Sequence, residues 1–173
     1  MSRRAEIERN TKETKIKIAL ELDGTGKAEL HSGIGFFDHM LDGFARHGLF
    51  DLTVDVDGDL DVDCHHTVED TGIVLGNAIR EAVGDKKGIR RYGSCILPMD
   101  EALVLCAVDL SGRCTLNWDV HCKTEKVGDF DVECASEFWL GFARNVPATL
   151  HFVQFAGENT HHILEACFKG AGH

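Results

Sequence analysis

Two motifs of the same type stand far apart in this chain, HHTVE at residues 65–69 and HHILE at residues 161–165. Each reads His-His-x-x-Glu, and imidazole and carboxylate groups together are ligands of divalent ions such as Mn²⁺, Fe²⁺ and Zn²⁺. On a helix, the first histidine and the glutamate four residues later share a face. Adjacent histidines are rotated by about 100° around the helix axis, so they point apart. The spacing therefore indicates two metal ions, with the histidines of each pair able to serve different ions.

A further ligand is expected from outside each motif. His39 lies four residues before the tetrapeptide GFAR at 43–46, and Glu137 lies four residues before the second GFAR at 141–144. A carboxylate can replace an imidazole on these metals. A mixed set without thiolates, leaving room for substrate, fits a catalytic ion better than a closed structural zinc site. The candidate metal ligands are His39, His65, His66, Glu69, Glu137, His161, His162 and Glu165.

Several basic residues near these motifs are candidates for binding a phosphate-sized anion. Arg90 and Arg91 follow a glycine, and Arg113 follows the Ser-Gly turn of DLSGR. Lys169 lies one turn beyond Glu165 on the helix expected for the second motif, which makes it the most suggestive of the four. Each of them alone is more typical of a solvated surface charge.

Composition excludes several classes of protein. The 173 residues carry a formal net charge of −11, which argues against a general nucleic-acid binder because such a protein needs a basic face. No run of 18 apolar residues predicts a membrane span, and the first residues lack the apolar segment of a secretory signal. The seven cysteines form no Cys-x-x-Cys pair, which favours small buried thiols in a reducing cytoplasm. Cys64, next to His65, keeps an alternative role as a metal ligand.

The two motifs belong to an internal repeat of the whole chain. The segment 13–24 aligns with 101–112, the two GFAR tetrapeptides align, and so do the two histidine motifs, always in the same order. Repeats of this kind indicate copies of one structural unit. We expect residues 1–90 and 91–173 to be the two copies, packed together as one compact unit. The second copy is expected to be truncated at its C-terminus, about eight residues into its last helix.

Periodicity predicts the elements of one copy. Alternation over 14–22 and 26–30 predicts a hairpin, and apolar spacing predicts helices over 36–48 and 67–84. The segment 49–64 alternates around Asp57-Gly58, so it is either one bent strand or a second hairpin. Two ββαβα units of this kind predict an α+β fold with sheets on one side and helices on the other.

Four long segments resemble the imidazoleglycerol-phosphate dehydratase family of histidine biosynthesis, and the resemblance covers nearly the whole chain. They are GIGFFDHMLDGFARHGLFDL (33–52), HHTVEDTGIVLGNAI (65–79), LPMDEALVLCAVDLSGR (97–113) and NTHHILEACFKG (159–170). The resemblance implies loss of water from imidazoleglycerol phosphate to give imidazole acetol phosphate. It also implies duplicated halves similar to domain 2 of ribosomal protein S5, two Mn²⁺ ions per active site, and trimers that assemble into a homo-oligomeric 24-subunit shell. Sites shared between subunits are part of that implication.

The resemblance also implies roles for individual residues. The eight candidate ligands named above would hold the metals. Glu13 and Glu69 are the candidate catalytic residues, with Glu13 at the family's acid–base position. His47, Arg91, Arg113 and Lys169 match positions that contact substrate or phosphate. The chain departs from the family at Glu137, where histidine is common, and in lacking a Ser-Ser-Lys-Gly tail that would contribute to phosphate binding and assembly.

Two other functions remain open from the sequence. One is a dinuclear metallohydrolase, in which the ions activate water. The absence of an obvious water-activating carboxylate free of the metals weighs against it. The other is a metal-binding module that is inactive without the tail.

Overall fold

The computed structural model describes residues 3–173. The first half of the chain contains β1 (Arg4–Asn10), β2 (Thr14–Glu21), β3 (Ala28–His31), α1 (Gly35–Gly48), β4 (Asp51–Gly58) and α2 (His65–Val83). The second half contains β5 (Tyr92–Met99), β6 (Ala102–Asp109), β7 (Thr115–Asp119), β8 (Lys126–Val127), β9 (Phe130–Asp131), α3 (Cys134–Asn145), β10 (Thr149–Ala156) and α4 (Thr160–Gly172). The boundary expected at residues 90 and 91 falls in the connection between α2 and β5.

The two halves repeat one sheet topology. The strand order is β1-β2-β4-β3 in the first sheet and β5-β6-β10-β7 in the second. In each sheet three strands are antiparallel neighbours, and the last pair, β3 with β4 or β7 with β10, is parallel. This arrangement confirms the α+β class. The first half has one strand more than the expected ββαβα unit, because residues 4–10 form β1, which periodicity did not predict. The second half has three more, because β5 corresponds to β1 and the short strands β8 and β9, which pair with each other, precede α3.

The hairpin expected between residues 14–22 and 26–30 is wrong. β4 lies between β2 and β3, pairs antiparallel with β2 over its whole length, and pairs in parallel with β3. The connection before β3 is held over the start of β4, because Asp51 Oδ1 accepts backbone N–H groups from Thr25 at 2.8 Å and Lys27 at 3.0 Å. Residues 49–64 contain a single strand, β4, followed by a turn, so the alternative of a second hairpin does not form.

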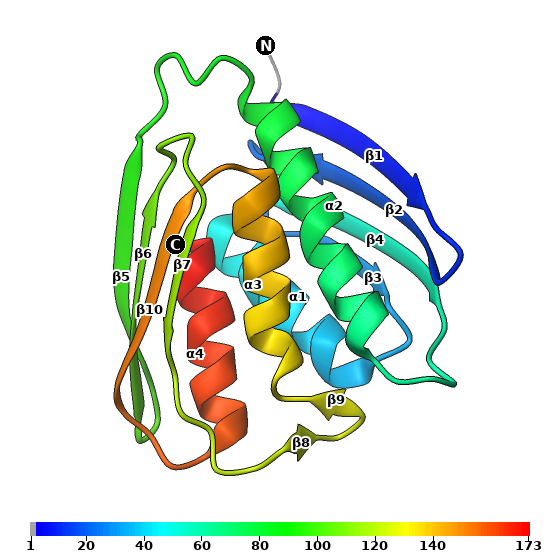
Figure 1. The fold of residues 1–173 in the computed structure, drawn as a ribbon. Helices are drawn as coiled ribbons and strands as arrows, with labels where there is room; N and C mark the ends of the chain where they lie inside the picture. The colour runs from blue at the N-terminus through cyan, green and yellow to red at the C-terminus, as the bar shows by residue number, and fades with distance from the viewer. Residues whose placement is uncertain (1–2) are drawn as a thin grey trace.

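The helices lie between the two sheets (Figure 1). Within each half a sheet covers one side and helices the other, as expected, but the halves meet through their helices. α2 packs against α3, and α1 packs against α4, so each helix pair joins one half to the other. The sheets therefore form the two outer faces of the molecule. No helix within residues 3–173 is both long enough and apolar enough to cross a membrane.

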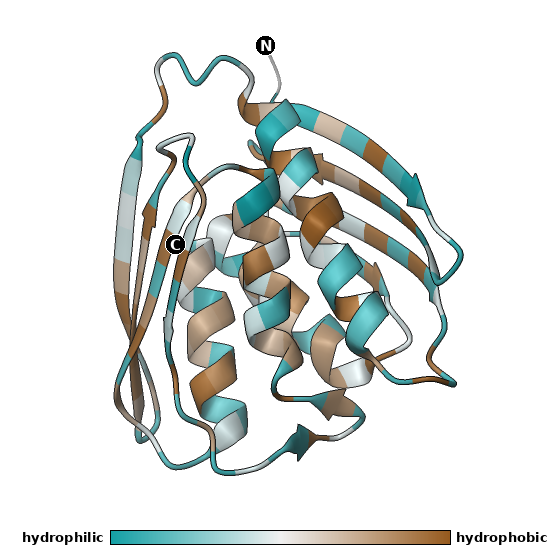
Figure 2. Cartoon of the chain, in the orientation of Figure 1, coloured by the Kyte–Doolittle hydropathy of each residue, from teal (hydrophilic) through white to brown (hydrophobic). Residues whose placement is uncertain are grey.

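Alternating apolar residues and close helix contacts build the core. Figure 2 shows hydrophobic and hydrophilic residues alternating along β1, β2 and β4, as in a sheet with one buried face. The largest buried side chains include Phe37, Phe138, Trp139, Phe152 and Phe168. Glycines in α2 allow that helix to approach α3 closely. The last helix, α4, is longer than the roughly eight residues expected from the sequence, because it begins at Thr160 and spans 13 residues.

Candidate metal centre and active site

Three of the eight candidate ligands form one compact cluster between α1 and α4. Their ligand atoms, from His39, His161 and Glu165, all lie within 4.8 Å of one another. His39 Nε2 is 3.5 Å from Glu165 Oε1, and His161 Nε2 is 3.2 Å from Glu165 Oε2. His39 belongs to the first half of the chain and the other two to the second. The cluster therefore exists only because α1 packs against α4.

Helical spacing positions the cluster. His161, Glu165 and Lys169 follow one another at intervals of four residues on α4, so they share a face. Gly43 lies one turn after His39 on α1, and a Cβ there would be 3.2 Å from Lys169 Cγ. The glycine therefore leaves room for the lysine stem beside the cluster.

Glu165 is the buried anion of the cluster, since only 5% of the residue is exposed. Burial by itself raises the pKa of its carboxyl group. Lys169 Nζ, at 2.6 Å from Oε1, and the nearby His39 and His161 outweigh burial, so the pKa lies below its usual value. A buried carboxylate whose two oxygens face imidazole nitrogens and an ammonium group is built to hold positive charge. This donor set fits a divalent ion such as Mn²⁺ or Zn²⁺.

The first histidine motif has a similar but looser arrangement. His65 Nε2 lies 3.5 Å from Glu69 Oε2 on α2. Glu137 stands on α3, and Gly141, one turn later, packs closely enough that a Cβ would be 3.1 Å from the Glu69 carbonyl oxygen. Within residues 3–173, however, these carboxylates and His65 do not bring three ligand atoms within 4.8 Å of one another. The role of Glu137 as a ligand stays a prediction.

The second histidine of each motif points away from the first, as the helical rotation predicted. Ring centroids are 6.2 Å apart in both pairs, with interplanar angles of 87° for His65 and His66 and 75° for His161 and His162. His66 Nδ1 lies 2.8 Å from Asp59 Oδ2, whereas His65 faces Glu69. Each histidine of a pair is therefore available to a different neighbour.

His162 also contacts a carboxylate that was not among the candidate residues from the sequence. Its Nδ1 lies 2.7 Å from Glu101 Oε2. Hydrogen bonds from the Asn159 backbone N–H and from His162 lower the pKa of Glu101 to about 2. The same contact raises the pKa of His162. A signal for Glu101 was present in the repeat, where it aligns with Glu13, but Asp59 had no such signal.

Glu13 lies immediately before β2 on the side of His66. Its backbone oxygen accepts the Asp59 N–H at 3.0 Å. Its charge contributes to the raised pKa of His66, after the larger effect of the Asp59 hydrogen bond. Across residues 3–173, the Glu13 side chain has no hydrogen bond or ion pair of its own. An exposed carboxylate without a fixed partner is accessible to a substrate.

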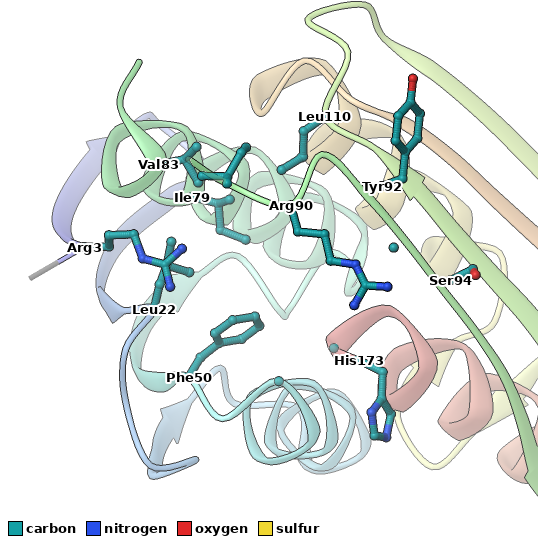
Figure 3. A pocket seen from close by; sticks show the side chains of 14 residues that line it. Arg3, Leu22, Phe50, Ile79, Val83, Arg90, Tyr92, Ser94, Leu110 and His173 are labelled. Atoms are coloured by element: carbon teal, nitrogen blue, oxygen red, sulfur yellow. The ribbon is translucent and has the colours of Figure 1, made fainter. Parts of the chain in front are cut away.

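The candidate substrate-binding residues fall into two groups. Lys169 belongs to the cluster, and His47 lies nearby, with Nδ1 at 3.1 Å from His173 Nε2. Burial, followed by the charges of Lys169 and His173, lowers the pKa of His47. His173 also lines a cavity of ≈ 400 Å³, where Figure 3 shows the Arg90 side chain directed toward it.

Arg91 and Arg113 form the second group, around Asp109 at the end of β6. Arg91 Nε donates to Asp109 Oδ1 at 2.7 Å, and its guanidinium lies 4.9 Å from the centre of the Tyr92 ring. The pKa of Asp109 is lowered, mainly by the hydrogen bond from Arg91, and the positive charge of Arg113 lowers it further.

Cys64 is not part of the histidine–carboxylate cluster. It is buried, with Sγ 3.8 Å from Cys134 Sγ and 3.3 Å from Asp131 Oδ2. Burial raises the pKa of both thiols. A buried thiol of raised pKa behaves as a small hydrophobic group.

The chain is similar in sequence and in fold to known imidazoleglycerol-phosphate dehydratases. Residues 32–173 match the family described as imidazoleglycerol-phosphate dehydratase. The chain is 58% identical over 171 residues to the imidazoleglycerol-phosphate dehydratase of Citrifermentans bemidjiense, covering 99% of this chain and 88% of that protein. The Geobacter sulfurreducens enzyme of the same name is 58% identical over 169 residues, covering 98% and 87%.

Two solved structures share the fold. The crystal structure of imidazoleglycerol-phosphate dehydratase from Staphylococcus aureus has a TM-score of 0.87 at 36% identity, covering 98% of this chain and 96% of that one. The enzyme from Pyrococcus furiosus, solved in complex with (S)-C348, has a TM-score of 0.85 at 42% identity, covering 96% and 89%. Sequence and fold agree over nearly the full length, which confirms the resemblance noted from the sequence. The chain belongs to the imidazoleglycerol-phosphate dehydratase family.

Proposed function

We propose that this chain is a Mn²⁺-dependent hydro-lyase that converts imidazoleglycerol phosphate to imidazole acetol phosphate and water in histidine biosynthesis. Family membership over residues 32–173 supports the reaction. The observation that carries the metal dependence is the cluster of His39, His161 and Glu165, whose donor atoms lie within 4.8 Å of one another. Two imidazoles and one carboxylate leave coordination positions open for substrate.

Residues of both motifs would hold the ions. His39, His161 and Glu165 would bind one, and His65, Glu69 and Glu137 are the pseudo-symmetric set for the other. His66 and His162, whose rings point away from His65 and His161, would be further ligands at sites shared between copies of the chain. An ion held there would supply Lewis-acid stabilisation of the deprotonated form of the substrate's imidazole ring, which would favour departure of the neighbouring hydroxyl group as water once its oxygen is protonated.

Glu13 is the group we propose for proton transfer. Its side chain has no hydrogen-bond partner within the described residues, and it lies beside His66, one of the candidate ligands. From there its carboxyl group can protonate the leaving oxygen or remove the proton from the adjacent carbon. General acid–base catalysis of this kind typically contributes 10²–10⁴-fold in rate. Glu69, the other candidate, is already directed toward His65 and suits a role in holding metal.

Lys169, His47, Arg91 and Arg113 are the groups we propose for the phosphate and the rest of the substrate. Lys169 offers an ammonium group next to the cluster, where an anion would replace Glu165 Oε1 as its partner. Arg91 presents a planar guanidinium fork suited to phosphate. Its present partner, Asp109, is a surface carboxylate that an incoming phosphate can compete with.

We also propose that copies of the chain assemble, as trimers within a 24-subunit shell. The outer face of the second sheet supports self-association. Ile96 is 58% exposed and Phe155 56% exposed there. The matching face of the first sheet carries charged residues such as Glu6, Lys17 and Asp55. Exposed apolar surface on one copy of a duplicated sheet is typical of a protein–protein contact.

A cytoplasmic location is proposed because all seven cysteines are free.

Turnover tests the proposal directly. The metal-loaded protein is incubated with imidazoleglycerol phosphate, and the ketone product is followed. We expect turnover that EDTA abolishes and added Mn²⁺ restores. Absence of ketone from the Mn²⁺-loaded protein would overturn the assignment.

The role of Glu13 has its own test. Glu13→Gln should still bind substrate but turn over about 10²–10⁴-fold more slowly, because the amide cannot take up a proton. Glu29→Gln, which changes another exposed glutamate, on β3, is the matched control and should keep the wild-type rate. A wild-type rate from Glu13→Gln would remove Glu13 from the mechanism.

Light scattering with and without Mn²⁺ on the same samples tests assembly.

A further inference from the structure

Glu101 connects the turn before β6 to the start of α4. Its Oε1 accepts two backbone N–H groups, from Glu158 at 3.1 Å and from Asn159 at 2.6 Å. Its Oε2 lies 2.7 Å from His162 Nδ1. The Asn159 side chain in turn caps α4 by accepting the His162 backbone N–H at 3.3 Å. Both oxygens of the carboxylate are therefore committed, and they face different partners.

These contacts determine which ring nitrogen of His162 carries a proton. An ionised carboxylate can only accept hydrogen bonds, so Nδ1 must be the donor. In the neutral ring the lone pair is then on Nε2. Asp100 Oδ2 is 3.5 Å from Nε2, longer than a normal N–H···O hydrogen bond, so it does not commit that nitrogen. His162 is thus presented as an Nε2 ligand.

In the first half a different carboxylate contacts Nδ1 of the corresponding histidine. Glu13 aligns with Glu101, yet His66 Nδ1 is held at 2.8 Å by Asp59. Six residues before each histidine pair stands Asp59 in one half and Phe155 in the other. The second half has no carboxylate at that position, so Glu101 is needed for His162. In the first half Asp59 makes the contact, and the Glu13 side chain is left free.

We propose that Glu101 is a positioning residue that holds His162 in the tautomer able to bind metal through Nε2, and that Asp59 does the same for His66. The duplicated glutamates have thereby divided their roles, Glu101 orienting a ligand and Glu13 remaining available to the substrate. The inference rests on the proposed function for the metal, but the tautomer itself can be measured without metal. Carboxylates that orient ligating histidines typically change metal affinity 10–100-fold when lost.

Glu101→Gln is the decisive variant because the backbone fixes the direction of the new amide. Two N–H groups require an acceptor at the Oε1 position, so the amide oxygen stays there. The amide NH₂ then faces His162 Nδ1 and donates to it. The proton of the neutral ring must move to Nε2, where it blocks coordination. The side chain keeps its size and its backbone hydrogen bonds.

Nitrogen NMR of metal-free protein labelled with ¹⁵N-histidine reads the tautomer, and a His162→Gln variant identifies the signal. We expect an Nδ1–H ring in the wild type and an Nε2–H ring in Glu101→Gln. A Mn²⁺ titration followed by electron paramagnetic resonance should show affinity at one class of sites about 10–100-fold weaker in the variant. Glu29→Gln is the control for both measurements and should match the wild type.

The outcomes separate the inference from the proposed function. If Glu101→Gln keeps the Nδ1–H ring, or changes the tautomer and binds Mn²⁺ like the wild type, the positioning role is wrong. A purely structural role for Glu101 predicts that second result, because the glutamine preserves the contacts to the backbone. If the wild type binds no Mn²⁺, the proposed function fails, and so does the ligand-presenting half of the inference, while the tautomer result stands on its own.

Discussion

A methyl group added at Gly72 should force two central helices apart. Gly72 lies on α2, one turn after Glu69, where α2 crosses α3. A Cβ built there would be 2.3 Å from the Phe138 carbonyl oxygen and 3.1 Å from its Cα, against 3.4–4 Å for an ordinary contact. The obstructing atoms are helix backbone, which cannot rotate away as a side chain can. Gly72→Ala therefore requires α2 and α3 to separate by about 1 Å.

Two effects of opposite sign determine the result. Alanine favours a helix over glycine by about 1 kcal/mol, which alone would stabilise the variant. Overpacking of a filled core costs about 1–3 kcal/mol, and a gap of about 1 Å forfeits a quarter to a half of each affected dispersion contact. Because this helix pair joins the two halves, many contacts are affected. We expect a net loss of about 1–2 kcal/mol in the free energy of unfolding, which lowers Tm by about 2–8 °C.

Thermal and urea unfolding of metal-free protein, at one fixed concentration, measure the effect. Gly35→Ala is the matched control, because Gly35 is also helical and a Cβ there meets no atom within 4 Å. The control should be as stable as the wild type or more so. If Gly72→Ala were stabilised as well, helix propensity would dominate, and the close approach of α2 and α3 would not limit the packing of the halves.

Two further predictions concern ligand binding and pH. Added Mn²⁺ should raise the Tm of the wild type, and each bound ion is expected to contribute about 2.7 kcal/mol at 100 times its dissociation constant. Glu165→Ala should lose the contribution of the ion at its own cluster, as thermal scans with and without Mn²⁺ would show. An equal gain in Glu165→Ala would contradict the role of the cluster. Hydrogen bonds from the backbone N–H groups of Thr25 and Lys27 are the main reason that the pKa of Asp51 is lowered. The ionised Asp51 carboxylate therefore stabilises the fold at pH values above the pKa of an unfolded aspartate, and this stabilisation is lost as the pH falls through the pKa of Asp51 in the folded protein. Asp51→Ala should thus be less stable than the wild type at neutral pH, and the gap in Tm should close as the pH is lowered below about 4; a gap independent of pH would refute the linkage.

Local patterns in the chain predicted most of the helices and the residue types of the site. Helical periodicity placed α1 and α2, and spacings of four residues placed His161, Glu165 and Lys169 on one face. The rotation between neighbouring helical residues correctly predicted that His65 and His66 diverge. These features succeed because each depends on a few consecutive residues and on fixed backbone geometry.

Strand pairing and second partners were beyond such patterns. The segment that forms β3 looked like the return strand of a hairpin, because alternation and a turn signal do not say which strand will be the neighbour. Asp59 and Glu101 contact His66 and His162 only through the folded turns that carry them. Carboxylates in turns are common in any sequence, so residue type alone did not distinguish these two.

The sequence by itself determined that the chain is a duplicated α+β protein with paired histidines and a glutamate at helical spacing, because repeats and periodicity are properties of the chain alone. Only the tertiary structure decided that His39 of the first half joins His161 and Glu165 of the second. Glycines on facing helices let α1 meet α4 and α2 meet α3, and helix contacts between distant segments depend on three-dimensional packing. The cluster is therefore a product of how the halves pack, although each half supplies its ligands by local helical geometry.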